Sequence, residues 1–238
     1  MSQNGSAANE HAGRVREMFA TIAGRYDFLN HLLSLNVDKK WRKLVVNRVR
    51  AKILASESLI LDVACGTGDL SLMLFEIDGA RVVGTDFCRP MLTIAAEKLP
   101  PDVRLIEGDA LSLPFKDETF DAVTIAFGLR NLAGVESGLK ELRRILKPNG
   151  WLAVLEFSRP SSAVLRPLFG LYFRKLLPLL GGVISGSRGA YSYLPASVSR
   201  FPDQQQLGSL MEQAGLDQVS FENLSGGIAA LHLGRRPE

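Results

Sequence analysis

The chain has 238 residues, a formal net charge of +3, 46% hydrophobic residues and 22% charged residues. This balance is ordinary for a soluble globular protein, and the length suffices for a large core, which argues against a disordered chain or a disulfide-dependent scaffold. No stretch reaches about 18 apolar residues without a charge or a proline, which argues against a transmembrane helix.

The N-terminal region carries no apolar or Arg-rich targeting pattern, so a cytoplasmic protein is expected. We predict a disordered tail over residues 1–13 and a helical cap over 14–57. The two cysteines, Cys65 and Cys88, are expected to be free thiols. The three histidines show no metal-ligand spacing, so no metal site is expected.

Strands and helices alternate over residues 58–159, which predicts parallel strands with helices on both faces of a sheet. The predicted strands are 58–65, 80–87, 103–110, 120–129 and 150–157, and the predicted helices are 69–77, 89–99 and 135–146. An apolar, basic insertion over 160–200 interrupts this order. Residues 201–238 then predict a helix and two closing strands, which are joined by a turn at Gly226 and Gly227.

The stretch "LILDVACGTGDLSL" places a tight glycine turn, Gly66-Thr67-Gly68, between a buried strand and a helix. Such a turn lets a ligand approach the backbone, and dinucleotide sites use the same device. Asp62 precedes the turn and Asp69 follows it. One like-charge contact with a pyrophosphate at about 6 Å would cost about 3 kcal/mol, whereas a cationic sulfonium would be favoured. The turn therefore favours a positively charged ligand.

Further acids follow the next strands. Asp86 ends the second strand, where a carboxylate can accept hydrogen bonds from both ribose hydroxyls. Asp109 ends the third, where its carboxylate and the N–H of Ala110 can read an adenine edge. One such Asp is more often a helix or turn cap. Four acids at successive strand ends, Asp62 and Asp69 included, indicate a nucleoside site.

Several motifs resemble those of class I S-adenosylmethionine-dependent methyltransferases, among them "DVACGTGDL", "GTDF", "EGDALSLPF" and "FDAVTIAFGLRNL". "YDFLNHLLSLNVDKKW" (26–41) and "RILKPNGWLAVLEFS" (144–158) resemble the two signatures of the menaquinone/ubiquinone biosynthesis C-methyltransferase family. The similarity runs from about residue 14 to 234. One departure is Asp38, where the family usually has His.

The resemblance implies an α/β, Rossmann-like class I methyltransferase fold with a mostly parallel seven-stranded sheet. It also implies S-adenosylmethionine as methyl donor and a ring carbon of a prenylated demethylquinol, above all demethylmenaquinol, as acceptor. Thr67, Asp86, Asp109 and Ala110 would contact the donor, with Asp62, Gly66 and Gly68 completing the site. Three alternatives stay open: another hydrophobic phenol or lipid as acceptor, a non-catalytic nucleotide-binding partner in quinone synthesis, and an NAD-dependent oxidoreductase.

The acceptor must be made nucleophilic. A phenol ionises with a pKa near 10, so forming its anion at neutral pH costs about 4 kcal/mol, which a fixed cation can offset. Arg130 in "FGLRNL" is the candidate cation, and Asn131 could hold the second ring oxygen. The alternative is that Arg130 closes a helix or pairs with Asp121. A second polar group is expected from Tyr26, Asp27 and Asn30 in the cap, where helix capping and packing is the alternative.

Two stretches contain no Asp or Glu yet combine basic and apolar residues: Phe157–Pro202 and Lys39–Ser56. Such surfaces suit anionic lipid. We therefore expect 160–190 to be a lid over the acceptor pocket, and a protein peripheral at the inner membrane face. A helix packed on the sheet edge or a homodimer interface is the alternative. Nucleic acid fits poorly, because no aromatic platform interleaves with the charges.

Overall fold

The computed structural model describes residues 3–27, 34, 36–53, 57–160, 170 and 188–238. Its helices are α1 (Gln3–Ile22), α3 (Val37–Arg50), α4 (Asp69–Phe75), α5 (Arg89–Lys98), α6 (Val135–Ile145), α9 (Arg188–Arg200) and α10 (Gln204–Gln213), with single 3-10 turns η1 (Ala23–Arg25), η2 (Leu129–Asn131) and η4 (Ser225–Gly227). Its strands are β1 (Ser58–Val63), β2 (Ala80–Asp86), β3 (Arg104–Glu107), β4 (Phe120–Ala126), β5 (Leu146–Phe157), β6 (Asp217–Leu224) and β7 (Ala229–Arg235).

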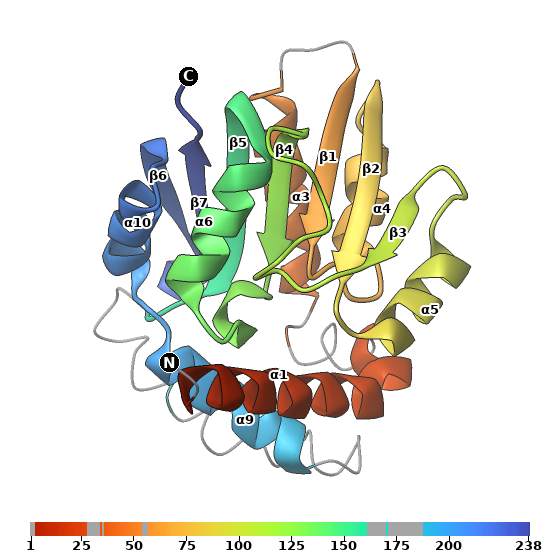
Figure 1. The fold of residues 1–238 in the computed structure, drawn as a ribbon, viewed down its shortest axis with the longest axis vertical. Helices are drawn as coiled ribbons and strands as arrows, with labels where there is room; N and C mark the ends of the chain where they lie inside the picture. Colours follow the sequence, from red (N-terminus) through yellow and green to blue (C-terminus); the bar gives the residue numbers. More distant parts are fainter. Residues whose placement is uncertain (1–2, 28–33, 35, 54–56, 161–169, 171–187) are drawn as a thin grey trace.

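The seven strands form one sheet in the order β3-β2-β1-β4-β5-β7-β6 (Figure 1). All neighbouring pairs are parallel except those of β7, which runs antiparallel to β5 and β6. The predicted α/β fold with a mostly parallel seven-stranded sheet is confirmed. The strand order reverses between β1 and β4, and ligands of such sheets bind beyond the carboxyl ends of the strands at this point.

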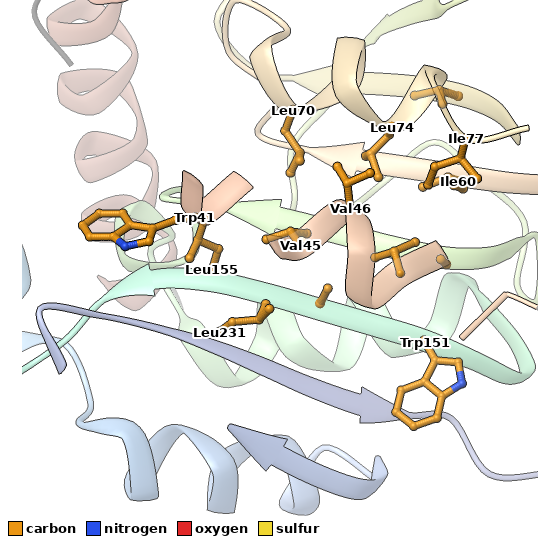
Figure 2. Packing of buried hydrophobic residues seen from close by; sticks show 14 of the residues in the cluster. Trp41, Val45, Val46, Ile60, Leu70, Leu74, Ile77, Trp151, Leu155 and Leu231 are labelled. Atoms are coloured by element: carbon orange, nitrogen blue, oxygen red, sulfur yellow. The ribbon is translucent and has the colours of Figure 1, made fainter. Parts of the chain in front are cut away.

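The buried strand residues alternate between the two faces of the sheet. Ile60 packs into a cluster with α3 and α4, whereas its neighbour Leu61 packs into a cluster with α6 and α10. Figure 2 shows the first cluster, in which Val45 and Val46 of α3 lie over β1, β4 and β5. Because both faces are covered, the strands read as nearly continuous apolar runs.

The closing hairpin of β6 and β7 carries the predicted glycine turn. Gly226 and Gly227 adopt φ values of 71° and 90°, which glycine reaches without a steric penalty. The buried His232 of β7 shares a 2.8 Å hydrogen bond between its Nε2 and the carbonyl of Gln204, the first residue of α10. This histidine therefore joins a helix to the sheet inside the core.

The N-terminal region differs from the prediction. Residues 3–13 belong to α1 instead of a disordered tail, as the first half of a helix that packs on α5 and α9. Both α1 and α9 lie across the carboxyl edge of the sheet (Figure 1). Of the predicted 160–200 insertion, which includes the expected 160–190 lid, the structure describes Pro160, Gly170 and helix α9; residues 161–169 and 171–187 lie outside the described residues. None of the described helices is long and apolar enough to cross a membrane.

Candidate methyl-donor and acceptor site

The glycine turn follows β1 as predicted. Gly66 and Gly68 have φ values of 57° and 85°, and the N–H of Gly68 donates to the carbonyl of Cys65. A Cβ at Gly68 would lie 2.8 Å from Leu99 Cδ1, so the turn also packs closely on the end of α5. Helix α4 begins directly after it, with its first N–H groups at the carboxyl edge of the sheet.

Two non-glycine residues beside this turn also have left-handed backbones. Ala64 follows β1 with φ 52°, and Phe127 follows β4 with φ 57°. A Cβ on Gly128 would lie only 2.5 Å from the Cβ of Ala64, so the two turns touch each other. Conformations of this kind cost about 1–3 kcal/mol each and persist where the surroundings enforce them, typically at ligand sites.

A cavity opens between these turns and α1. Its wall includes six predicted site residues: Tyr26, Gly66, Asp86, Asp109, Ala110 and Asn131. Five other predicted residues are outside that wall: Asp27, Asp62, Thr67, Gly68 and Arg130. Asn30 lies outside the described residues. The structure thus brings the predicted donor residues of three strand ends together with Asn131 on the acceptor side.

Asp86 organises the side of the cavity that the sequence analysis assigned to the methyl donor. Its Oδ2 accepts from the N–H of Gly66 at 2.9 Å and its Oδ1 from the N–H of Cys88 at 2.8 Å. Burial raises the pKa of Asp86, and the N–H groups of Cys88 and Gly66 oppose that shift. Each carboxylate oxygen keeps a second lone pair, so this side chain can accept from ribose hydroxyls while it holds the turn.

The loop after β3 forms the side of the cavity where the sequence analysis placed the adenine. The Oδ1 of the exposed Asp109 accepts from the N–H of Leu111 at 2.9 Å, and Ala110 is buried beside it. A Cβ at Gly108 would lie 3.0 Å from Thr85 Oγ1 and 3.1 Å from Pro114 Cδ. The glycine therefore allows this loop to fold tightly against β2, which sets the place of the Asp109 carboxylate.

Asp62 does not take the position that the sequence argument gave it. Its side chain is 1% exposed and accepts from Ser71 Oγ at 2.6 Å and from Thr124 Oγ1 at 2.8 Å. Burial raises the pKa of Asp62 to about 6, while the two hydroxyls lower it. The carboxylate joins β1 to α4 and β4 behind the turn, so it supports the glycine turn from within.

Asp69 is also different from the prediction. Its carboxylate pairs with Lys98, and its Oδ2 lies 3.8 Å from an Nη1 of Arg42. The open acidic rim inferred from Asp62 and Asp69 is therefore absent: one acid is buried and the other is neutralised by cations from α5 and α3. Among the described residues, Asp86 and Asp109 are the acids that line the cavity.

Arg130 pairs with a partner that the sequence did not indicate. Its Nη1 lies 2.7 Å from Oε1 of Glu156, which is 1% exposed and is the second-last residue of β5, and the same nitrogen donates to the carbonyl of Phe127. The expected alternative partner, Asp121, binds Lys147 instead. The Nε of Arg130 is buried and has no hydrogen-bond partner within the described part of the chain.

The N-terminal segment reaches the glycine turn through Asp27. Thr67, which is buried, donates from its hydroxyl to Asp27 Oδ1. Tyr26 packs edge-on against Phe19 with ring centroids 5.9 Å apart, and both line the cavity. Asp38, the departure from the family pattern, is buried and pairs with Arg42 one helical turn later, away from the cavity wall.

Sequence reasoning missed the wall that α1 supplies. Ala12 and Phe19 line the cavity, together with Phe87 and Met91 after β2. The signal was present as an apolar spacing over Val15, Phe19 and Ile22, but the polar residues before it masked the start of the helix. The pairing of Arg130 with Glu156 was not predictable, because the two residues are 26 positions apart and meet only through the β4–β5 register.

Residues 6–236 match the model of the ubiE/COQ5 methyltransferase family. The chain is 50% identical over 224 residues to a demethylmenaquinone methyltransferase of Thermus thermophilus, covering 92% of this chain and 100% of that protein. It is 41% identical to a ubiquinone/menaquinone biosynthesis C-methyltransferase UbiE of Geotalea uraniireducens, covering 95% of this chain and 98% of that protein.

A solved structure from Thermotoga maritima, described as a SAM-dependent methyltransferase and possible histamine N-methyltransferase, superimposes with a TM-score of 0.65. The match covers 92% of this chain and 98% of that one at 21% identity, which supports the fold alone. The family match and the fold together set aside the oxidoreductase and the non-catalytic subunit. The chain belongs to the ubiE/COQ5 methyltransferase family and is an S-adenosylmethionine-dependent methyltransferase.

Proposed function

We propose that the protein C-methylates a prenylated demethylquinol in quinone biosynthesis, with demethylmenaquinol as the acceptor and menaquinol as the product. The names of the similar proteins from Thermus thermophilus and Geotalea uraniireducens support this acceptor class. The observation that carries the proposal is one cavity that joins Asp86 and the glycine turn to Phe127 and Asn131. A donor and a flat acceptor can therefore meet in it.

The residues present fit the methyl donor. Gly66 and Gly108 let the backbone approach a nucleoside, Asp86 would bind the ribose hydroxyls, and Asp109 with Ala110 would bind the adenine edge. Thr67, Gly68 and the buried Asp62 would shape the turn around the amino-acid end. When bound, S-adenosylmethionine supplies an electrophilic methyl group, so the chain itself has to orient and activate the acceptor.

Arg130 would supply that activation. Arg130 directly precedes Asn131, which lines the cavity, and a hydrogen bond from its guanidinium to a quinol oxygen would lower the pKa of that phenol. Glu156 holds the guanidinium in place through the Nη1 contact. Asn131 would hold the second ring oxygen, while Tyr26, Asp27 and Asn30 would close the site from the N-terminal segment.

Incubation with labelled S-adenosylmethionine and a panel of demethylated quinols tests the function. We expect label in a product that has gained one methyl group on a ring carbon, which tandem mass spectrometry can locate. Non-prenylated naphthols and simple lipid phenols serve as the comparison set. Methyl transfer to oxygen, or transfer only to acceptors outside the quinols, would contradict the proposal.

We further propose that the enzyme contacts anionic membrane at the inner face. The exposed residues of α3 include Lys39, Lys40 and Lys43, and this end of the helix lies beside the cavity, since Trp41 packs against Phe127. Each basic residue near an anionic surface contributes about 1 kcal/mol to binding. A prenyl tail resides in the bilayer, so this placement would bring the cavity to its acceptor.

Vesicle flotation checks the membrane contact. The triple variant Lys39→Glu, Lys40→Glu, Lys43→Glu is expected to lose binding to vesicles with anionic lipid by at least about 30-fold, and added salt should weaken the wild type. A control with the same charge change at the exposed residues Arg104, Lys116 and Lys140 should still float. Equal flotation of both triple variants would exclude α3 as the contact.

A further inference from the structure

A chain of ion pairs connects four segments around the glycine turn. Arg42 of α3 pairs with Asp38 and lies 3.8 Å from Asp69 at the start of α4. Lys98 in the last turn of α5 binds the same Asp69 and also lies 3.2 Å from Oδ2 of Asp27. The series therefore runs from α3 through α4 and α5 to the N-terminal segment.

The charges in this series do not balance. Three carboxylates alternate with two cations, so each cation lies between two acids and attracts both. Burial decreases along the series: the side chain of Arg42 is 8% exposed, that of Lys98 is 29% exposed and that of Asp27 is 33% exposed. Loss of Lys98 would leave Asp27 and Asp69 facing each other as like charges, whereas Arg42 would still hold Asp69.

Lys98 lies where α5 supports the glycine turn. Its neighbour Leu99 contacts Gly68 so closely that a Cβ on the glycine would clash with it. The end of α5 thus touches two consecutive residues: Gly68 through Leu99 and Asp69 through Lys98. The ammonium can therefore set the position of the first residue of α4 relative to the turn.

Asp27 links Lys98 to the glycine turn. It accepts from the hydroxyl of Thr67 in the middle of the turn and from the ammonium of Lys98. Tyr26, directly before it, lines the cavity. The rest of the N-terminal segment is held by a small apolar cluster, in which Ala23 meets Cys88 and Met91. The polar contact at Asp27 is thus where this segment meets the turn.

We propose that Lys98 is a positioning residue for the methyl-donor site: by binding Asp27 and Asp69 together, it holds the cavity wall of the N-terminal segment against the glycine turn. The inference rests on the assignment of this cavity to the donor. It gives Lys98 no contact with the reacting atoms, so its loss acts on donor affinity and leaves the methyl-transfer step itself unchanged.

Calorimetric titration with S-adenosylhomocysteine, without acceptor, tests the proposal. Lys98→Met is expected to raise the Kd about tenfold, whereas kcat at saturating donor stays within about twofold of the wild type. Lys98→Arg can bind both carboxylates and should restore the Kd to within about threefold. Lys140→Met makes the same exchange at an exposed position of α6 and should leave the Kd unchanged.

A second variant separates positioning from general destabilisation. Asp27→Asn removes the charge that Lys98 neutralises, so Asp27→Asn with Lys98→Met should bind no more weakly than Lys98→Met alone. If the loss of binding free energy in the double variant equals the sum of the losses in the two single variants, the proposal is overturned. A Kd of Lys98→Met within twofold of the wild type would also overturn it. A wild type that fails to bind S-adenosylhomocysteine would instead refute the assignment of the cavity.

Discussion

Asp86→Asn is expected to raise the Kd for S-adenosylhomocysteine about 100-fold. An asparagine can accept one of the two N–H groups that now bind Asp86, but its own NH₂ then faces the other donor. It also loses the charge that strengthens hydrogen bonds from the ribose hydroxyls, and a bond to a charged group contributes about 1.5–3 kcal/mol. Weakening each of two such bonds by about 1.4 kcal/mol gives the expected factor.

The matched control for this prediction is Asp78→Asn. It makes the same charge change on the exposed turn before β2, so its Kd should equal that of the wild type. For an analogue of S-adenosylhomocysteine without the 2′-hydroxyl, the Kd values of the wild type and Asp86→Asn should differ less than they do for the parent ligand. A Kd of Asp86→Asn within about threefold of the wild type would place the ribose elsewhere.

Arg130→Ala is expected to lower turnover about a thousandfold and to destabilise the protein by about 3–5 kcal/mol. The first effect follows from loss of the proposed stabilisation of the developing phenolate. The second follows because Glu156, 1% exposed, would be left buried without its cation. Chemical unfolding and steady-state kinetics on the same preparation measure the two effects.

A double variant separates these two roles of Arg130. Arg130→Ala with Glu156→Gln removes the buried charge as well as its partner, so most of the lost stability should return while turnover stays low. Donor affinity should remain within a few-fold of the wild type, because Arg130 lies outside the cavity wall that Asp86 shares. Recovery of turnover together with stability would show that Arg130 acts only on the fold.

The strands and the glycine turn were predictable because their signals are local. "SLILDVAC" is an apolar run that ends at a Gly-x-Gly turn, and β1 with α4 forms there as expected. The position of Asp86 and Asp109 at the same sheet edge follows from parallel strands alone, since their carboxyl ends coincide. The predicted closing turn at Gly226 and Gly227 likewise needed no information from distant residues.

The electrostatics of the site were less predictable, because ion pairs join residues that are far apart in the sequence. The sequence suggested that Asp69 faces the ligand as an unpaired anion, but in the fold Lys98 of α5 and Arg42 of α3 form ion pairs with it. Asp62 faces the space between β1 and β4, where Thr124 lies opposite it in the parallel register. The direction of a side chain at the end of a strand thus decides whether an acid faces the cavity or the core.

The aromatic packing at the end of α3 has a practical consequence. The chain has two tryptophans: Trp41 packs against Phe157 at the carboxyl end of β5, whereas Trp151 lies within that strand, well away from Trp41 (Figure 2). Trp41 touches Phe127 in the cavity wall, with ring centroids 6.1 Å apart, whereas Trp151 lies under the ammonium of Lys52 at 4.0 Å. The indole of Trp41 is therefore an intrinsic fluorophore placed beside the cavity, and Trp151→Phe would isolate its emission as an optical signal of ligand binding.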